Sequence, residues 1–213
     1  MIGILAAVFF LSGCESTRFL QEIGLEEQVT NIIQIQDEIA YLPDNKEPFT
    51  GKYTEFYSTN GQLKSEINYV DGIKNGPCTS WFENGKKESE ENYEDGKQDG
   101  LFTTWYQSGQ KKSETNYVDG KADGLYSLWY ENGQKKTEIN YKDGEVNGLF
   151  IWWYENGQKM SETTYKDGKV NGITSEWDEN GRQKGEINHQ EDHWGNIKSF
   201  KYGQTGKTCC ENF

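Results

Sequence analysis

The chain is short of hydrophobic residues and of positive charge. Hydrophobic residues make up 33% of its 213 residues, which is below the average for a globular chain, and many of them are aromatic. We therefore expect a thin core rich in aromatic side chains. A formal net charge of −13 disfavours nucleic acid and anionic lipid headgroups as partners, because both need clustered Lys and Arg.

Cysteine is scarce too, and the first one follows an apolar run. Residues 1–13 carry no charged side chain and are too short to span a bilayer as a helix, which is typical of an export signal. Leu11-Ser12-Gly13-Cys14 resembles the lipobox of bacterial lipoproteins, although no Lys or Arg precedes the run as in that pattern. The resemblance implies a signal peptide over residues 1–13, lipid on Cys14, and a membrane-anchored, exported protein of the bacterial cell envelope, most simply of the outer membrane. The alternative is a buried terminal segment.

The remaining cysteines are Cys78, Cys209 and Cys210. Three thiols cannot form a disulfide framework. The vicinal pair Cys209-Cys210 could be redox-active, or it could belong to a frayed terminus.

A repeat of 24 residues governs the rest of the chain. Asp-Gly recurs at Asp71, Asp95, Asp119, Asp143 and Asp167, with Asn-Gly or Ser-Gly midway at Asn84, Ser108, Asn132, Asn156 and Asn180. A fixed period of this length indicates a repeat array, whose function lies in the surface that the stacked units share. We therefore expect a protein that is not an enzyme and has no cofactor.

Each unit has the pattern of a β-hairpin. Between Gly100 and Tyr117, two alternating runs flank Ser108-Gly109, and the Asn-Gly of the sibling units predicts a two-residue type I′ turn. This register pairs Tyr106 with Lys111, Trp105 with Lys112, Thr104 with Ser113 and Phe102 with Thr115. It places Phe102, Thr104, Tyr106, Ser113, Thr115 and Tyr117 on one face, and Leu101, Trp105, Lys112 and Glu114 on the other. In the Asp-Gly links, glycines allow positive φ and aspartates can accept backbone N–H groups in Asx-turns.

Consecutive hairpins predict an all-β fold, an elongated single-sheet antiparallel meander. Six hairpins start near Phe49, Pro77, Leu101, Leu125, Leu149 and Ile173, and a degenerate seventh, Ile197 to Thr208, caps the array. At about 4.8 Å between strands, twelve strands make a ribbon roughly 55–60 Å long. We expect a tether or linker over residues 14–37, the repeat array over 38–188, opened by a strand at Glu38–Leu42, and the capping repeat and tail over 189–213.

The unit from Tyr141 to Lys159 resembles the MORN-repeat variant of bacterial proteins, many of which are named YwqK-type antitoxins. The resemblance extends from about Phe49 to Asn188, and Pro48-Phe49-Thr50-Gly51-Lys52 matches the entry motif. It implies an elongated β-meander that serves as a protein-interaction or membrane-associated scaffold, in many cases exported on a lipoprotein signal. The antitoxin role is implied by the family name alone. The chain has no phosphate-binding glycine loop followed by Lys-Ser or Lys-Thr.

Two clusters could hold a metal ion. His189 and His193 lie four residues apart with carboxylates between them, but the repeat places His189 in the column of Tyr165 at a strand end and His193 in a turn. The pairs Asp95/Asp99 and Asp119/Asp123 could suggest calcium, but Asx-turns explain them without an ion. We predict no metal site.

Glutamate and tryptophan recur as columns. Glu66, Glu90, Glu114, Glu138, Glu162 and Glu186 have identical surroundings, which general acid–base catalysis does not favour, and we expect them to pair with Lys64, Lys112, Lys136 and Lys184. The tryptophans, Trp81, Trp105, Trp129, Trp153 and Trp177, either pack on lysine stems or form a ladder that binds glycans or headgroups. Trp152 breaks the pattern on the opposite face and marks the best local binding position. We expect an unidentified protein partner, with the glycan ladder as the alternative.

Overall fold

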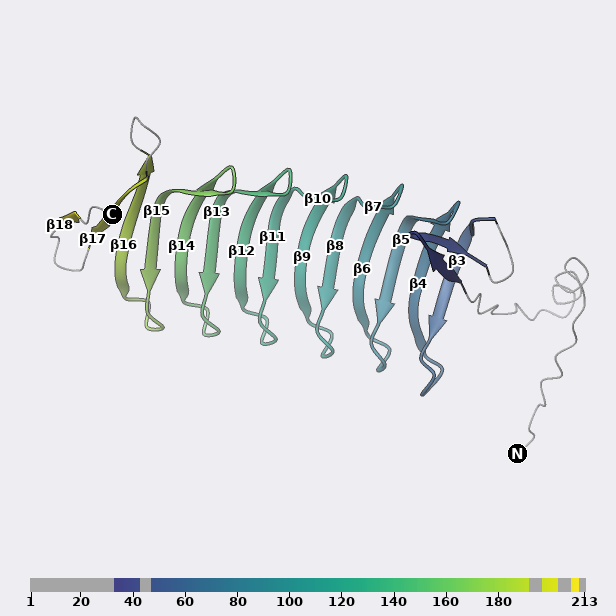
Figure 1. Ribbon diagram of the computed structural model, residues 1–213. Coiled ribbons are helices and arrows are strands. Elements are labelled where there is room, and N and C mark those ends of the chain that lie inside the picture. The colour runs from purple at the N-terminus through teal and green to yellow at the C-terminus, as the bar shows by residue number, and fades with distance from the viewer. Residues whose placement is uncertain (1–32, 43–46, 192–196, 203–207, 211–213) are drawn as a thin grey trace, which may run out of the picture. The chain divides into compact units, whose positions relative to one another are not determined.

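The structure is a computed structural model that describes residues 33–42, 47–191, 197–202 and 208–210 (Figure 1). It is all-β, and in this part of the chain no helix is long and apolar enough to cross a membrane. The strands are β1 (Gln34–Gln36), β2 (Ile39–Tyr41), β3 (Gly51–Phe56), β4 (Leu63–Val70), β5 (Ile73–Trp81), β6 (Lys87–Glu94), β7 (Lys97–Gln98), β8 (Gly100–Trp105), β9 (Lys111–Val118), β10 (Lys121–Ala122), β11 (Gly124–Trp129), β12 (Lys135–Lys142), β13 (Glu145–Trp153), β14 (Lys159–Lys166), β15 (Lys169–Trp177), β16 (Gln183–Glu191), β17 (Ile197–Tyr202) and β18 (Thr208–Cys210).

Strands β3 to β18 form one open antiparallel sheet in which neighbours in sequence are neighbours in space. The six predicted hairpins are confirmed as β3–β4, β5–β6, β8–β9, β11–β12, β13–β14 and β15–β16, and β17–β18 adds the predicted seventh. Figure 1 shows these hairpins side by side along the sheet. Cys209 and Cys210 belong to β18, which pairs with β17, so their backbone is not frayed.

Strands β7 and β10 are short pieces separated from β8 and β11 by Asp99 and Asp123. Where Asn75, Asn147 or Asn171 takes that position, β5, β13 and β15 run through it without a break. The Asn75 amide donates to the Asp95 carboxylate of the next repeat, with Nδ2 and Oδ1 3.2 Å apart. An aspartate cannot donate this bond, and Asp99 Oδ2 accepts the Asp119 N–H instead at 3.1 Å.

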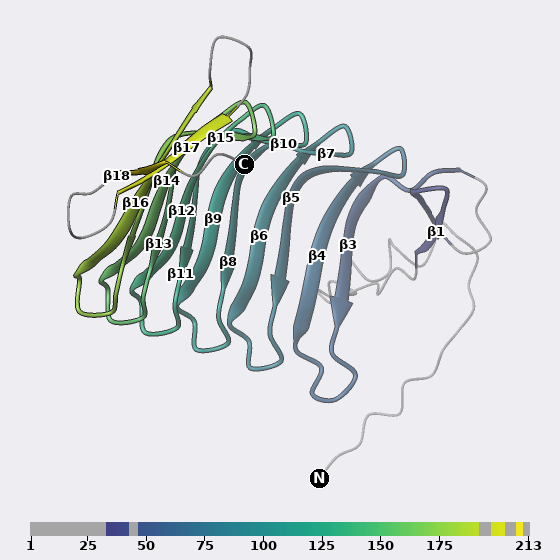
Figure 2. The same cartoon turned by 60° about the vertical axis from the view of Figure 1, so that its left-hand side comes forward.

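The strand expected to open the array is a strand, but it does not join the main sheet. Strand β2 pairs with β1 in a separate two-stranded sheet, which Figure 2 shows beside the β3 end, and Tyr41 of β2 forms an isolated bridge with Pro48. It is tied to the array through Ala40, whose N–H donates to Gly72 O at 2.9 Å and whose carbonyl accepts the Phe49 N–H at 2.8 Å. The short hairpin therefore caps the first Asp-Gly turn, as terminal units of repeat proteins do.

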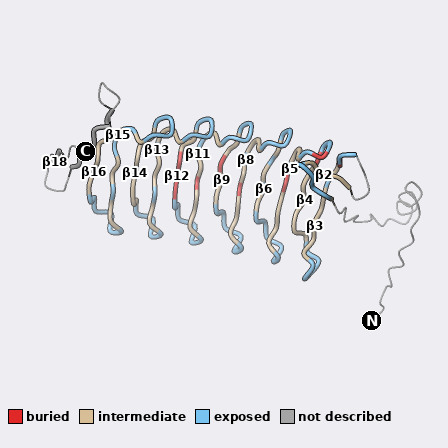
Figure 3. Tube along the Cα trace, in the orientation of Figure 1, coloured by how far each residue is buried: buried red, intermediate tan, exposed pale blue. Residues whose placement is uncertain are grey.

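The core is thin, as the composition predicts. Among the described residues the buried hydrophobic ones are Ala40, Phe49, Tyr69, Cys78 and Ile139, and the first three pack together where the β1–β2 hairpin meets the array. Figure 3 shows how few positions of the array are buried. The Cys78 thiol has a raised pKa because burial disfavours the thiolate.

The two long edges of the sheet have different turns. At the Asp-Gly edge, Asp71, Asp95, Asp119, Asp143 and Asp167 have φ of 46–52° and the glycines after them 75–86°, with the flanking residues paired, as Lys142 is with Glu145. Positive φ at both central residues is the type I′ geometry.

The predicted type I′ turn at Asn-Gly is wrong. At this Asn-Gly edge only the glycine has positive φ, such as 85° at Gly133, and the loop has three residues in the hairpins from β5–β6 to β15–β16 and four in β3–β4. The Tyr130 N–H donates to Gln134 O at 2.8 Å and the Gly133 N–H to Tyr130 O at 2.9 Å. This is a type I turn followed by a left-handed glycine.

A bulge next to each Asn-Gly turn changes the predicted register. Trp105 pairs with Lys111 rather than Lys112, and Tyr106 bonds to Gln110, while Thr104–Ser113 and Phe102–Thr115 pair as predicted. Lys112 is therefore the extra residue. Its ammonium group lies over the Tyr106 ring, on the face opposite Trp105.

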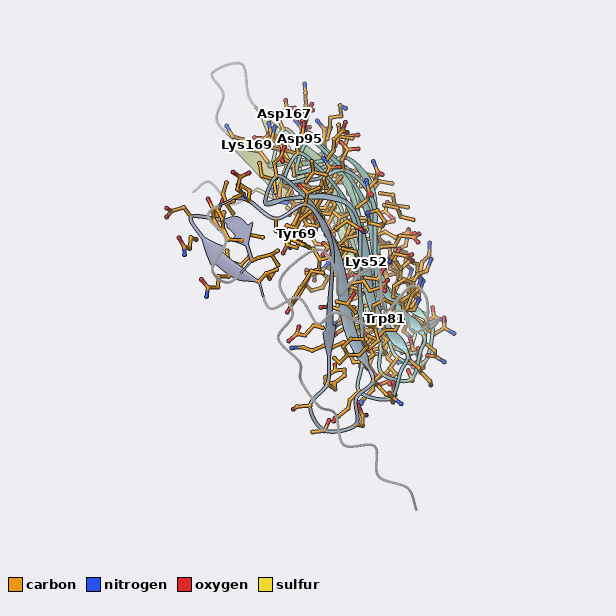
Figure 4. All side chains as sticks on the ribbon, turned by 90° about the vertical axis from the view of Figure 1, so that its right-hand side faces the viewer. Lys52, Tyr69, Trp81, Asp95, Asp167 and Lys169 are labelled. Atoms are coloured by element: carbon orange, nitrogen blue, oxygen red, sulfur yellow. The ribbon has the colours of Figure 1, made fainter. Side chains whose placement is uncertain are left out.

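We call the two sides of the sheet the tyrosine face and the tryptophan face. The tyrosine face carries Phe102, Thr104, Ser113, Thr115 and Tyr117 and their counterparts in the other repeats, with Phe102 and Tyr117 in ring contact. The tryptophan face carries Leu101, Thr103, Trp105 and Glu114 and their counterparts. Figure 4 looks along the sheet and shows Tyr69 and Trp81 on opposite sides of it.

Candidate functional site

The five tryptophans of the column lie at the ends of β5, β8, β11, β13 and β15, on the tryptophan face, and all are half-buried. Lysines of the preceding hairpin cover three of them: Lys87 Nζ lies 5.7 Å from the Trp105 ring centroid, Lys111 5.5 Å from Trp129, and Lys159 5.3 Å from Trp177. These distances are within the range of cation–π contacts. The arrangement supports packing of these rings on lysine side chains, and a binding role for Trp81, Trp105, Trp129, Trp153 and Trp177 stays a prediction.

The glutamate column lies on the same face, but its expected lysine partners are wrong. Glu114 accepts from Lys111, with Nζ and Oε2 2.6 Å apart, Glu90 from Lys87, at 3.0 Å, and Glu138 from Lys135. Glu66 is bound by Lys52, while Lys64 binds Glu55. For Glu114 and Glu138 the bulge moves the lysine partner back by one residue. Lys87, Lys111 and Lys159 each contact both a glutamate of their own hairpin and the tryptophan of the next hairpin.

Leu101, Leu125, Leu149 and Ile173 form a third column on the tryptophan face. Their exposed fractions are 55%, 47%, 41% and 44%, which is high for large aliphatic side chains in strands. They precede Trp105, Trp129, Trp153 and Trp177 by four residues and so share the same face. Their recurrence every 24 residues was visible in the sequence, but only the structure shows that nothing in the described residues covers them.

Trp152 is on the tyrosine face and is 46% exposed, as its strand position predicts. Its ring centroid lies 5.6 Å from that of Phe150, which in turn contacts Tyr165. It lines two hollows. The first, of about 190 Å³, is also lined by Ser161 and Thr163. The second, of about 120 Å³, is also lined by Tyr130 and Met160. The structure thus separates Trp152 from Trp153, which lies on the opposite face.

Polar side chains of the Asn-Gly edge link each hairpin to the next. The Tyr130 hydroxyl donates to Trp153 O at 2.8 Å, and the Asn132 amide donates to Glu155 O at 2.9 Å. Equivalent hydroxyl bonds run from Tyr57, Tyr106 and Tyr154, and equivalent amide bonds from Asn60, Asn84 and Asn156. Sequence reasoning missed this ladder, although the 24-residue recurrence of Tyr and Asn was the signal for it.

Asx-type bonds occur at this edge as well, and not in the described Asp-Gly turns. Asn132 Oδ1 accepts the Gln134 N–H at 2.9 Å, whereas Asp99 and Asp123 accept N–H groups of the following repeat. Asp123 also binds Lys142 at 2.6 Å, and the lysine lowers the pKa of that carboxyl. The four carboxylates considered for calcium are therefore bound by other groups: Asp99 and Asp123 by backbone N–H groups, Asp119 and Asp123 by lysines, and Asp95 by the Asn75 amide.

His189 lies in β16 opposite Gly172, in the position that Tyr165 occupies opposite Gly148, which confirms the predicted column. His193 and Cys14 lie outside the described residues. Among those that are described, no three His, Cys, Asp or Glu side chains are placed to hold a metal ion. Burial and the neighbouring Glu91 raise the pKa of Tyr93 to about 12.

Comparison with protein families gives one match. The model of the MORN repeat variant matches five segments, residues 50–71, 74–95, 98–119, 122–143 and 146–167, which together make up just over half of the chain. The first segment starts one residue before β3, the other four start within a strand that leaves the Asp-Gly edge, and all five end at the aspartate of the next Asp-Gly turn. No curated protein matches the chain.

Proposed function

The chain belongs to the MORN repeat variant family, and we propose that it is a non-enzymatic, envelope-anchored scaffold that binds a protein partner through its sheet surface. Repeats of this family commonly serve as protein- or membrane-interacting scaffolds. A partner protein rather than nucleic acid is in accord with the net charge of −13.

The exposed aliphatic column of the tryptophan face carries this proposal. Leu101, Leu125, Leu149 and Ile173 recur at the repeat spacing on a face where the tryptophans are only half-buried. Scattered exposed leucines are ordinary, but an aligned apolar column rimmed by ion pairs is typical of an interaction surface. An extended surface of this kind is how stacked repeats bind their partners.

Crosslinking in the native envelope, followed by purification of the full chain, tests this proposal. The double substitution Leu125→Glu and Leu149→Glu should reduce capture of the partner at least about tenfold, because two carboxylates would be buried at the interface. The matched control is Val70→Glu with Val118→Glu, two exposed valines of the same face that lie beside Asp-Gly turns and outside the aliphatic column. This control should leave capture unchanged. Equal capture by both double variants, with unchanged far-UV spectra, would overturn the assignment of the aliphatic column as the binding surface.

The antitoxin role is a narrower form of the same proposal. It is implied by the names of similar proteins, and it predicts that the captured partner is a toxin whose activity falls when the two proteins are co-expressed.

A glycan-binding ladder is the second candidate, and the exposure of Trp152 favours it. A glycan array probed with the full chain separates the two classes. Saturable sugar binding lost in Trp152→Ala supports the glycan function at this position, and loss in Trp153→Ala supports a ladder on the tryptophan face. Absence of sugar binding removes this candidate and leaves the protein-binding proposal intact.

Anchoring through Cys14 completes the proposal and rests on Leu11-Ser12-Gly13-Cys14. Cys14→Ser should release the protein from the membrane fraction or leave it unprocessed. Membrane fractionation and intact mass measure this, and an unchanged distribution and mass would exclude the lipid anchor.

A further inference from the structure

One hollow of the tyrosine face lies at a place where three positions of the repeat carry a different residue type from that in the following hairpins. It has a volume of about 440 Å³ and lies between the β5–β6 and β8–β9 hairpins near the Asn-Gly edge. Its lining includes Ser80, Phe82, Glu88, Tyr106 and Lys112. The corresponding place two hairpins further on has only about 120 Å³, because Trp152 and Met160 fill it.

At two of these positions the β5–β6 hairpin lacks the contact between a lysine and a tyrosine ring that the next two hairpins have. In the next two hairpins a lysine lies over a tyrosine: Lys112 Nζ is 5.7 Å from the Tyr106 centroid and Lys136 Nζ 5.2 Å from that of Tyr130. The equivalent residues in the β5–β6 hairpin are Glu88 and Phe82. A carboxylate therefore replaces the ammonium group beside this ring.

The third change leaves space for a ligand group. The column that reads Ser80, Thr104, Leu128 and Trp152 grows in size along the chain, and the two smallest members line this hollow. Ser80 is also bonded across the strands to Ser89, with the hydroxyl oxygens 2.8 Å apart. Glu88 is exposed, and among the described residues no ion pair neutralises it.

We propose that this hollow binds a lysine or arginine side chain of the partner protein, with the cation between the Phe82 ring and the Glu88 carboxylate. The incoming cation takes the place that Lys112 and Lys136 occupy in their own repeats. A ring face and a carboxylate together are the surroundings that favour a desolvated ammonium or guanidinium group. Lys112 also lines the hollow, but its ammonium group already lies over Tyr106. The proposal rests on the protein-binding function and names the partner chemistry at one point of the scaffold.

Ligand-observed NMR with the full chain tests the chemistry directly. The probes are the N-acetyl amides of lysine, arginine and norleucine, the last being a neutral chain of similar length. Saturable binding is expected for lysine and arginine, and it should weaken as salt is raised. Binding of the norleucine amide as strong as that of the lysine amide would show an apolar hollow without cation selectivity and would overturn the proposal.

Glu88→Lys is the decisive variant because it restores the residue type of the neighbouring repeats and should therefore fold. It is expected to weaken binding of the lysine amide at least about tenfold, since the new ammonium group would occupy the site. Glu179→Lys makes the same charge change at an exposed turn residue and should leave binding unchanged. Equal binding by the two variants, or no saturable binding to the unmodified chain, would exclude the site.

Capture of the partner in the envelope separates this inference from the function it rests on. If Glu88→Lys captures the partner as well as the unmodified chain does, the scaffold function stands and the cation site falls. If the unmodified chain captures no partner while the amides bind as expected, the scaffold function falls and the site stands.

Discussion

The Asp-Gly and Asn-Gly edges reverse the chain with the same kind of dipeptide but with different geometry. Asp143 and Gly144 both have positive φ, and the turn holds two residues. At Asn132-Gly133 only the glycine is left-handed, and the loop holds three residues. Both dipeptides favour type I′ turns when judged by local preference.

Bonds between repeats distinguish the two edges. At the Asp-Gly edge a backbone bond joins successive repeats, because the Gly144 N–H donates to Ala122 O of the preceding repeat at 2.8 Å, and side-chain bonds such as that from Asn75 to Asp95 add to it. At the Asn-Gly edge side chains that donate to backbone carbonyls of the next repeat make the link, among them the Tyr130 hydroxyl and the Asn132 amide. The longer loop places the Asn132 side chain where it can bond both its own turn and the next one. Turn type in a stacked array is therefore set by the neighbouring repeat as well as by the dipeptide.

Deleting chain segments has the largest expected effect, because the two edges must alternate. Removing residues 122–145 deletes one whole repeat and should leave a shorter sheet that still melts cooperatively. Removing residues 134–145 deletes β12 and its Asp-Gly turn, so that β11 would lead into β13, which runs in the same direction. We expect this variant to lose most of its strand signal in far-UV spectra. Equal damage from both deletions would argue against alternating edges.

The repeat order could be predicted from the sequence, whereas the displacement at each bulge could not. The 24-residue period predicted the six hairpins, and the alternation of strand residues predicted the faces of Phe102, Thr104, Thr115 and Trp152. Successive side chains of a strand point to opposite faces whatever the type of the adjoining turn. Beside the turn, one extra residue moves Lys112 to the other face and gives Lys111 its place.

The β1–β2 hairpin could not be predicted from the sequence for a different reason. Its turn residues are Asp37 and Glu38, both with positive φ, so a glutamate takes the place of the expected glycine. The dipeptide Asp37-Glu38 is not one of the sequences that predict a tight turn, and strands of three residues are too short to show an alternating pattern. The aliphatic column was visible as a recurrence, but its exposure depends on the lack of a second layer over the tryptophan face, which no local pattern reports.

Glycine should be required at both edges. Gly133→Val and Gly144→Val each place a β-branched residue at φ near 85°, and each should lower the free energy of unfolding by about 1–3 kcal/mol. The cost is backbone strain, because a Cβ at Gly133 would meet no atom within 4 Å. Denaturant melts measure the effect. Glu131→Val, in the same loop at ordinary φ, is the control and should stay within about 0.5 kcal/mol; a loss as large as that of Gly133→Val would contradict the argument.

Substituting the residue before each glycine separates the two turn types. Asp143→Gly should change stability by less than about 0.5 kcal/mol, because glycine tolerates the φ of 52° at that position. Asn132→Gly should cost about 1–2 kcal/mol, because it removes the bonds to Glu155 O and from the Gln134 N–H without relieving any positive φ. If both turns were type I′, the two substitutions would be equally well tolerated in the same melts.

The smallest effects should come from single hydroxyls of the ladder between hairpins. Tyr130→Phe removes the bond to Trp153 O and should cost about 0.5–1.5 kcal/mol. Phe82 holds the same place one hairpin before Tyr106 and has no hydroxyl to offer to Trp105 O, so Phe82→Tyr should restore the ladder and raise stability by up to about 1 kcal/mol. A double-mutant cycle should show the two changes to be additive, because the bonds lie in different pairs of hairpins. If Phe82→Tyr destabilises the protein, a hydroxyl at this position does not form the bond to Trp105 O. The hydroxyl bonds between hairpins would then be confined to the pairs of hairpins in which they are seen.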